Sequence, residues 1–297
     1  MNFSVVFCVE PGYLAAQATL LANSFRTWAG EYRDAQMFAV QPRASGAIPQ
    51  ATLEAFQAAG VTFITQDLNR DFADSPPCNK VFASELIEHT ADTDFILFTD
   101  TDCIFLNPPS AALLPDGINL AVQPVVKKFH ATSHRFDRYA GLWRRMYKSA
   151  GVTPPDFVRT TVSRVRIRAY YNAGIAVFRR SAGICRTWLE MMRAINTLVE
   201  GRTRIHLDQF ALALAAAKIG GVKLLPETLN YSIGRRAEYA PPHNAMPLSS
   251  LTHVHYHRTF FEHGFLEKLK PAFDRGEERY KWLSERLPLA GDYSIPR

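Results

Sequence analysis

The sequence Asp94-Phe-Ile-Leu-Phe-Thr-Asp-Thr-Asp-Cys-Ile-Phe-Leu-Asn-Pro108 decides the fold. Its first part, Phe95 to Phe98, is an unbroken apolar run, too short for a helix and rich in aromatic and β-branched residues. Such a run predicts a strand that is buried on both faces, as in a parallel sheet. Two carboxylates, Asp100 and Asp102, follow it, and a second apolar run, Cys103 to Leu106, comes next.

This DxD motif stands where an α/β sheet binds its ligand, at the carboxyl end of a central strand. Two carboxylates one residue apart are costly to bury unless they hold a cation, and carboxylate oxygens select hard cations such as Mg²⁺ or Mn²⁺. The alternative is that Asp100 and Asp102 are solvated turn residues. Asp92-Thr93-Asp94 has the same pattern but precedes the strand, at the end opposite the site, so the tripeptide alone is weak support.

The composition is that of a soluble globular protein. The chain has 297 residues, of which 47% are hydrophobic and 21% are charged, enough for one large α/β domain or two small ones. The formal charge of +6 suits an anionic ligand, but no nucleic-acid-binding motif accompanies it, so we expect no nucleic-acid partner.

Cysteine usage and hydropathy bear on location. The four cysteines are scattered without a CxxC pair, which predicts reduced thiols and a cytoplasmic protein; they are Cys8, Cys78, Cys103 and Cys185. The amino terminus lacks the features of a signal peptide, and no apolar run approaches the length of a membrane span. We expect peripheral membrane contact at most.

Strand and helix patterns alternate along the chain. Strands are expected at 3–9, 37–40, 61–65, 95–98, 118–123, 170–178, 222–225 and 251–256, and helices at 13–28, 49–59, 79–89, 184–199 and 206–219. This alternation predicts an α/β fold with a mainly parallel central sheet and helices on both faces. With no repeat and no clear linker, residues 1–297 are expected to form a single domain.

Three segments depart from the alternation. Residues 127–168 contain a predicted helix at 134–149, a Pro-Pro pair and a basic stretch, and we interpret them as an insertion over the carboxyl edge of the sheet; a solvated, irregular surface is the alternative. Residues 232–250 look like loop. The tail, 259–297, is expected to be helical near 265–273 and 277–287.

Three histidines in the last strand form a second polar cluster. His253, His255 and His257 alternate along the expected strand and would point to one face. Three imidazoles could hold zinc, whereas one imidazole joining two carboxylates suits Mn²⁺. A polar strand face near the surface is the remaining interpretation.

Three further positions carry polar groups toward the expected site. Asn172-Ala173-Gly174 interrupts an apolar strand, and a glycine there marks either close approach of a ligand or another backbone, or a β-bulge. Asp208-Gln209 opens an apolar helix, where Asp208 also suits the helix dipole. Lys80 opens the helix before the central strand and would place a cation near the site.

Together these motifs resemble the glycogenin-like and bacterial galactosyltransferase-like retaining glycosyltransferases. The features that match, in order, are the first strand with Tyr13, Asn79-Lys80, the run from Phe95 through the DxD motif to Pro108, Tyr171-Asn-Ala-Gly174, Asp208-Gln209 and Val254-His-Tyr256. The resemblance spans residues 3–258 and implies a nucleotide-diphospho-sugar transferase fold (GT-A, Rossmann-like).

The resemblance also implies roles for individual residues. Asp100, Asp102 and His255 would bind Mn²⁺ or Mg²⁺, which would bridge the diphosphate of a nucleotide sugar, usually a UDP-sugar. The remaining donor contacts would come from Val9, Glu10, Tyr13, Lys80 and Thr101, and the donor sugar would be surrounded by Asn172, Asp208 and Gln209. The acceptor, which could be a glycan, a lipid-linked sugar or a protein, is not identified by any motif.

One departure from the family concerns the diphosphate. The late family motif continues His-Tyr-x-Gly-x-x-Lys-Pro-Trp, but here Arg258 replaces the glycine and no lysine follows at that spacing. Arg258, Arg235 or Arg236 could supply the charge, because guanidinium groups suit phosphate oxygens. We expect transfer with retention; an inverting enzyme would need a carboxylate base, for which the candidates are Asp208, Glu227 and Glu238.

Three other interpretations remain open at this point. A haloacid-dehalogenase-type phosphatase also places DxD after an apolar strand, but its Gly-Thr continuation is missing. A sugar-nucleotide pyrophosphorylase would need a Gly-rich, Arg-containing loop in place of Glu10-Pro11-Gly12-Tyr13. A non-catalytic nucleotide-sugar-binding module could retain the same fold.

Overall fold

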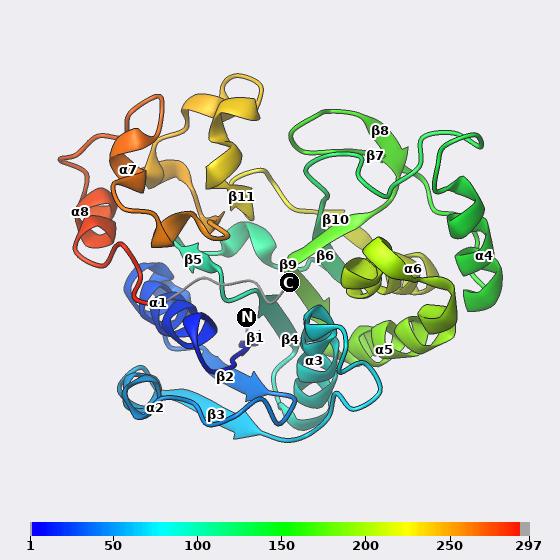
Figure 1. Ribbon diagram of the computed structural model, residues 1–297, viewed down its shortest axis with the longest axis horizontal. Helices are drawn as coiled ribbons and strands as arrows, with labels where there is room; N and C mark the ends of the chain where they lie inside the picture. The colour runs from blue at the N-terminus through cyan, green and yellow to red at the C-terminus, as the bar shows by residue number, and fades with distance from the viewer. Residues whose placement is uncertain (1, 292–297) are drawn as a thin grey trace.

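A seven-stranded sheet forms the centre of the protein in the computed structural model, which describes residues 2–291 (Figure 1). The strands lie in the order β10-β6-β9-β4-β1-β2-β3. Their bounds are β1 Phe3–Cys8, β2 Gln36–Gln41, β3 Val61–Thr65, β4 Phe95–Thr99, β6 Leu120–Pro124, β9 Tyr171–Arg179 and β10 Val222–Leu224. Only β9 runs antiparallel to its neighbours, β4 and β6, among these strands. The mainly parallel sheet is confirmed.

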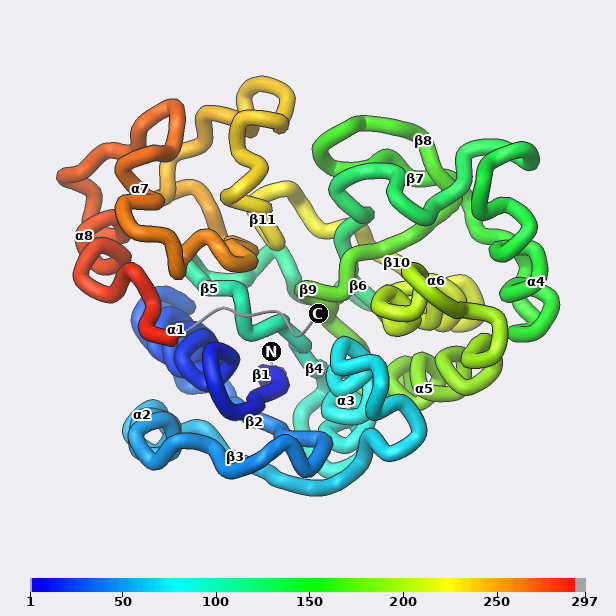
Figure 2. The backbone as a smooth tube through the Cα atoms, viewed as in Figure 1, coloured from blue at the N-terminus to red at the C-terminus, as the bar shows by residue number. Residues whose placement is uncertain are grey.

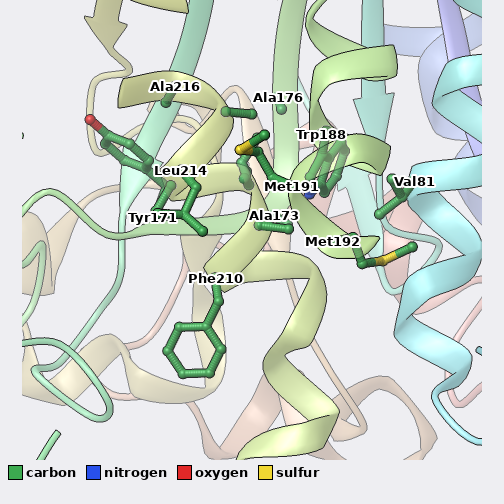
Figure 3. Close-up of a cluster of buried hydrophobic side chains, with 14 of the residues drawn as sticks. Val81, Tyr171, Ala173, Ala176, Trp188, Met191, Met192, Phe210, Leu214 and Ala216 are labelled. Atoms are coloured by element: carbon green, nitrogen blue, oxygen red, sulfur yellow. The ribbon is translucent and has the colours of Figure 1, made fainter. Parts of the chain in front are cut away.

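Both faces of the sheet are covered by helices, as the apolar strands require. Helices α3 (Asn79–Thr90), α5 (Ile184–Ile195) and α6 (Leu207–Ile219) lie on one face, and α1 (Tyr13–Trp28) and α2 (Gln50–Ala58) lie on the other (Figure 1). The side chains of β4 alternate between the two faces: Ile96 and Phe98 pack with the first group, and Phe95 and Leu97 with the second. Figure 3 shows part of the first core, where Trp188 and Phe210 are fully buried.

A second, three-stranded sheet brings a late segment of the chain beside the DxD motif. Its order is β11-β12-β5, formed by Tyr231–Ser232, His253–His255 and Cys103–Phe105. Strand β12 pairs antiparallel with β5, with Val254 opposite Ile104. Figure 2 shows this late part of the chain lying against β5. The strand at 251–256 was expected, but its pairing with β5 in a separate sheet was not.

The segment 127–168 is more regular than its composition indicated. Helix α4 spans Ala140–Ala150, so the expected start at His134 is wrong. The preceding residues form a turn instead, because the Asp137 carboxylate accepts hydrogen bonds from the backbone N–H groups of Ser133 and His134. The basic stretch contributes an antiparallel hairpin, β7 (Phe157–Arg159) with β8 (Arg166–Arg168).

The end of the chain also differs from expectation. The segment expected to be loop holds three 3₁₀ helices, at Ile233–Glu238, His243–Ala245 and Leu248–Ser250. Helix α7 is only Phe265–Lys268, because Pro271 disfavours helical backbone in the residue before it, and α8 is Glu278–Ser284. Residues 292–297 of the expected helical tail lie outside the described residues. Between residues 2 and 291, no helix combines the length and apolar character needed to cross a membrane.

Candidate active site

The first DxD carboxylate is held by a lysine. Asp100 follows β4, and Lys80 in the first turn of α3 places its Nζ 2.8 Å from Asp100 Oδ1 and 3.4 Å from Asp208 Oδ2. Burial alone would lower the pKa of Lys80, but the two carboxylates outweigh it and the pKa lies above its ordinary value. Lys80 therefore lies between two carboxylates at the end of the central strand.

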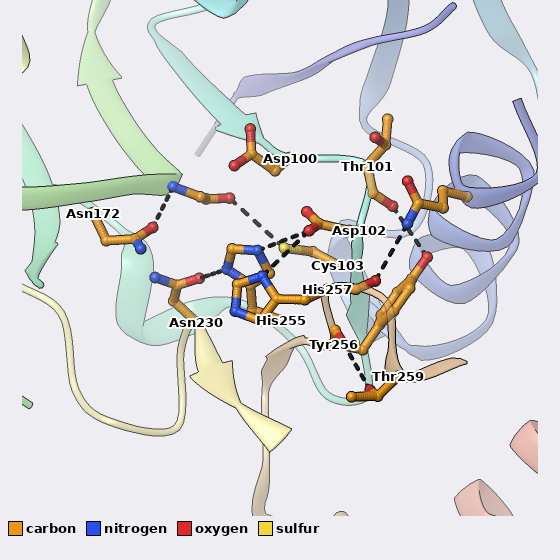
Figure 4. Close-up of polar contacts among 12 residues, drawn as sticks. Asp100, Thr101, Asp102, Cys103, Asn172, Asn230, His255, Tyr256, His257 and Thr259 are labelled. Atoms are coloured by element: carbon orange, nitrogen blue, oxygen red, sulfur yellow. Dashed lines mark hydrogen bonds and ion pairs between the residues drawn. The ribbon is translucent and has the colours of Figure 1, made fainter. Parts of the chain in front are cut away.

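The second DxD carboxylate faces two histidines (Figure 4). Asp102 Oδ2 lies 3.1 Å from His255 Nε2 and 3.5 Å from His257 Nδ1. Burial acts to raise the pKa of Asp102, but His255 and His257 hold it well below its usual range. The pKa of His255 is correspondingly raised, because Asp102 overcomes the effect of burial.

Asn230 orients His255, although no motif in the sequence singles it out. Its Oδ1 lies 3.0 Å from His255 Nδ1, whose N–H donates a hydrogen bond to it in the tautomer that this contact requires. The lone pair of Nε2 then faces the Asp102 carboxylate, an arrangement that needs a proton or a cation between the two groups. Asn230 adopts a positive φ of 60°, which asparagine tolerates in turns, but that signal does not reveal its partner.

Gly174 makes room for this contact. A β-carbon at this position would lie 2.8 Å from Asn172 Oδ1, 2.9 Å from Asn230 Oδ1 and 2.9 Å from His255 Nδ1. The pairing of β9 with β6 also shifts register between Val122 and Gln123, so the strand is irregular beside this glycine. Asn172 Oδ1 accepts a hydrogen bond from the Gly174 N–H at 2.6 Å, which turns the asparagine toward the site.

A cavity of about 250 Å³ opens beside the DxD motif at the carboxyl ends of β1 and β4. Among its lining residues are six of those expected to bind donor or metal: Glu10, Tyr13, Lys80, Asp100, Thr101 and Asp102. Val9 and Arg258 do not line it: Val9 is fully buried in the core, and Arg258 is exposed in the turn after β12.

Glu10 enters this cavity already paired. Arg43 contacts both of its carboxylate oxygens, with Nη2 2.7 Å from Oε2, and Asn79 Nδ2 donates to Oε1 at 2.9 Å. No sequence signal pointed to Arg43, because it lies on the loop after β2 with no motif around it. The pair fixes the Glu10 side chain against α3.

Asp208 and Gln209 lie in the first turn of α6, where Asp208 contacts Lys80. Asp208 is 1% exposed, and burial, only partly offset by Lys80, raises its pKa to about 6. Gln209 is half-buried, with Nε2 3.5 Å from His206 Nδ1, and the His206 ring lies 4.8 Å from that of His130 in the segment 127–168. Aspartate, amide and imidazole groups therefore meet at this helix start.

The three late histidines do not form one metal-binding face. His253 is buried, with Nε2 2.9 Å from Thr99 Oγ1, and its Nδ1 accepts the Asn230 N–H at 3.2 Å. His257 lies past the end of β12 with a φ of 52°, so strand alternation no longer sets its direction. Within the described part of the chain, the side chains that cluster as metal ligands are Asp102, Cys103 and His255, whose ligand atoms lie within 4.8 Å of one another.

The fold and the site define a class. A mainly parallel α/β sheet with helices on both faces, and acidic and histidine side chains at its strand ends, is the architecture of GT-A glycosyltransferases. Residues 5–220 match the family described as the Rhodobacterales glycosyltransferase domain. Because this match covers most of the chain, the protein belongs to that family and is a glycosyltransferase; the phosphatase interpretation is set aside.

Solved structures share the fold at low sequence identity. The galactosyltransferase LgtC, in complex with donor and acceptor sugar analogues, is 16% identical over 99% of this chain and 97% of its own, with a TM-score of 0.58. The bifunctional glycosyltransferase WbbM is 14% identical over 96% of this chain and 52% of its own, with a TM-score of 0.55. Mouse xyloside xylosyltransferase 1 is 12% identical over 86% of this chain and 98% of its own, with a TM-score of 0.50. No curated protein matches the sequence. The expected resemblance to GT-A enzymes is confirmed.

Proposed function

We propose that the protein transfers a sugar from a nucleotide diphosphate donor, a UDP-sugar, with the help of a divalent cation and with retention of configuration. The observation that supports this proposal best is the cavity beside the DxD motif. Its wall joins the residues that follow β1 with Lys80 and both DxD carboxylates, so one ligand could contact all of them. A nucleotide sugar has a base, a diphosphate and a sugar, and the cavity wall offers them aromatic, charged and hydroxyl groups such as those of Tyr13, Lys80 and Thr101.

The residues beside the cavity suit a hard divalent cation. We propose Asp100, Asp102 and His255 as its ligands, with Mn²⁺ as the ion because the set mixes oxygen and nitrogen. Asn230 supports this assignment, since metal-binding histidines commonly donate their other ring N–H to an oxygen. When bound, the cation would stabilise the charge of the diphosphate leaving group as a Lewis acid.

Donor binding would draw on both sides of the cavity. We propose that Tyr13, Glu10 and the backbone near Val9 lie against the base, and that Thr101 and Lys80 contact the sugar nucleotide. For the diphosphate, Arg258 is the best placed of the three arginines considered. Arg235 is 3.2 Å from Glu238, and Arg236 is buried with its Nε on the Asn244 carbonyl, whereas Arg258 is exposed in the turn that follows His255.

The donor sugar would sit near Asn172, Asp208 and Gln209. Two of the three carboxylates that could serve as the base of an inverting enzyme are already paired with cations, which supports retention. Glu227 lies 2.5 Å from Arg164, and Glu238 lies 2.6 Å from Lys127. A glutamine also belongs to the active site of one structural neighbour, since one LgtC structure is that of an active-site mutant in which glutamate replaces glutamine. We assign Gln209 to the site by that analogy.

The acceptor would enter from the segment 127–168. A second cavity, of about 510 Å³, lies between the β7–β8 hairpin and the chain after β10, and its lining includes Phe157, Arg159, Arg164, Leu225, Glu227 and His243. Its mixture of apolar, basic and acidic groups suits a polar acceptor such as a glycan or a lipid-linked sugar. We propose that residues 1–297 act as one domain with this insertion over the active-site edge, and, since the four cysteines are free, that the protein is cytoplasmic.

A thermal-shift panel of nucleotides and nucleotide sugars, with and without Mn²⁺, tests the proposal. At about a hundred times its dissociation constant, a ligand adds about 2.7 kcal/mol, which raises the melting temperature by at least a few degrees. We expect UDP or one UDP-sugar to stabilise the wild type only with Mn²⁺, and Asp102→Ala to lose the effect. Asp94→Ala is the matched control, because Asp94 belongs to the exposed DxD before β4.

Binding that ignores both Mn²⁺ and Asp102 would rule out the DxD motif as the donor site. Retention is tested separately, by NMR of the anomeric configuration in the transferred product. A product with the configuration opposite to that of the donor would overturn the retaining mechanism while leaving the donor assignment intact.

A further inference from the structure

We propose that Asp102, Cys103 and His255 form a binding site for a thiophilic divalent cation such as Zn²⁺, and that this site overlaps the proposed Mn²⁺ site. If the protein has the proposed function, zinc bound at this site should inhibit it, and this consequence alone rests on the proposed function. The site itself rests on the positions of the three side chains. Neither the DxD motif nor the histidine cluster alone indicated that a thiol belongs to this group.

Strand pairing places the cysteine and the histidine together. Cys103 of β5 lies directly opposite His255 of β12 in an antiparallel pair. Directly opposed residues in such a pair project to the same side of the sheet with their β-carbons about 5 Å apart. Asp102 precedes Cys103, and its Oδ2 lies 3.1 Å from His255 Nε2. One atom from each of the three side chains falls within 4.8 Å of the other two.

The groups around Asp102 favour Cys103 and His255, rather than Asp100, as its partners in holding a cation. Asp100 is turned to Lys80, whose Nζ lies 2.8 Å and 3.0 Å from its two oxygens, so a cation at Asp102 must find its other ligands nearby. Cys103 Sγ is 3.9 Å from the Gly174 carbonyl, a weak contact that a metal bond would replace. Asn230 keeps Nε2 of His255 directed toward Asp102. Figure 4 shows the Cys103 sulfur beside Asp102 and His255.

The ligand chemistry selects the cation. Thiolate and imidazole suit Zn²⁺, which binds three protein ligands and leaves a fourth position open in many sites, whereas Mn²⁺ and Mg²⁺ prefer oxygen. Binding requires only that the Cys103 thiol release its proton to solvent as the Zn–S bond forms, with no change of oxidation state. Since Asp102 and His255 would be shared, the two kinds of cation exclude one another, and zinc would compete with Mn²⁺.

Cobalt titration of the full chain tests the site directly, because Co²⁺ replaces Zn²⁺ and a cobalt–thiolate bond gives a charge-transfer band in the near ultraviolet. We expect a band that saturates at one Co²⁺ per chain in the wild type and is bleached by stoichiometric Zn²⁺. Cys103→Ala should lose it. Cys185→Ala is the matched control and should keep it, because Cys185 is equally buried but begins α5, next to Glu88.

Zinc affinity gives a second readout. It should fall at least about tenfold in Cys103→Ala, since even the loss of a group that only supports a ligand costs that much. If Cys103→Ala does not fold, Cys103→Val takes its place, because valine suits a buried strand position. No thiolate band in the wild type, or an undiminished band or zinc affinity in the Cys103 variants, would overturn the proposal.

The two proposals fail in different ways. If Mn²⁺ supports UDP binding but cobalt gives no thiolate band, only the zinc site is wrong. If the band appears but no nucleotide binds with Mn²⁺, the zinc site stands and the proposed donor function is wrong. If both hold, Zn²⁺ should abolish Mn²⁺-dependent UDP binding in the wild type, and Cys103→Ala should require at least about ten times more Zn²⁺ for the same effect.

Discussion

Asn230 Oδ1 lies 3.0 Å from His255 Nδ1, and this contact directs the other ring nitrogen of His255 toward Asp102. Asn230 directly precedes β11, and His255 is the last residue of β12, the strand that pairs with β11 in parallel. Removal of the amide should therefore free the imidazole to rotate or to change tautomer. Asn230 is the positioning residue of the proposed metal site.

Asn230→Gly should weaken Mn²⁺ binding by about 10- to 100-fold, the usual cost of losing a hydrogen-bond partner of a metal-binding histidine. Glycine is chosen because it accepts the positive φ of residue 230 without strain. The measurement is a Mn²⁺ titration of nucleotide binding by calorimetry. Asn230→Asp retains an oxygen acceptor and should restore most of the affinity; equal Mn²⁺ affinity in the glycine variant and the wild type would show that Asn230 does not position His255.

Gly174→Ala should disturb both the fold and the metal site. Its β-carbon would lie under 3.0 Å from side-chain atoms of Asn172, Asn230 and His255, so at least one of them must move. We expect a loss of about 1–3 kcal/mol in the free energy of unfolding, typical of overpacking, together with weaker Mn²⁺ binding. Urea denaturation measures the first and calorimetry the second.

Gly141→Ala is the matched control for that variant. Gly141 lies inside α4, where an added β-carbon comes no closer than 3.9 Å to another group. It should stabilise the protein by up to about 1 kcal/mol, since alanine is the better helix former. An equal loss of stability in the two variants would mean that the crowding around Gly174 has no special effect.

Asp208→Asn should stabilise the protein increasingly as the pH rises. Burial raises the pKa of Asp208 from 3.8 to about 6, so the folded state holds its proton at pH values where the unfolded state has lost it. The charged carboxylate therefore lowers stability progressively between those two values, and the full penalty, at most about 3 kcal/mol, applies above pH 6. Below pH 3.8 the penalty disappears.

Urea denaturation of wild type and Asp208→Asn at pH 5 and pH 8 measures this difference. The gain from the substitution should be larger at pH 8 than at pH 5, and sugar transfer should fall if Asp208 contacts the donor as proposed. A gain that does not depend on pH would show that the Asp208 carboxyl is not the titrating group.

Arg164→Ala should weaken acceptor use and spare donor binding. Arg164 adopts a positive φ of 56°, which is a costly backbone conformation for arginine. Its guanidinium lies 2.5 Å from Glu227 in the wall of the second cavity. The same outcome is expected for Arg166→Ala and Arg168→Ala, since both guanidinium groups lie 4.1 Å over the Phe157 ring that lines this cavity.

Donor hydrolysis without acceptor, and transfer to any glycan acceptor identified with the wild type, separate the two effects. We expect a higher KM for the acceptor with unchanged hydrolysis. Arg186→Ala, on the exposed side of α5, is the control and should change neither. Loss of donor hydrolysis in Arg164→Ala would place the hairpin in the donor site instead.

The elements that the sequence predicted well are those with local signals. The stripe of apolar residues in α1 repeats every turn and gave both ends of that helix, and the apolar run of β4 identified the central strand. The predicted helix bounds were wrong where a single side chain stops the helix. The turn that Asp137 forms moves the start of α4 to Ala140, and Pro271 shortens the helix expected at 265–273.

The sequence by itself determined the fold class, the family and the strand ends where the proposed site lies, because hydrophobic periodicity and short motifs are local properties of the chain. Only the tertiary structure decided which groups meet there. Cys103 faces His255, Asn230 orients that histidine, and Arg43 holds Glu10, through contacts between residues far apart in the chain. Such pairings depend on how separate strands come into register, and no periodicity within one segment encodes the partner that another segment supplies.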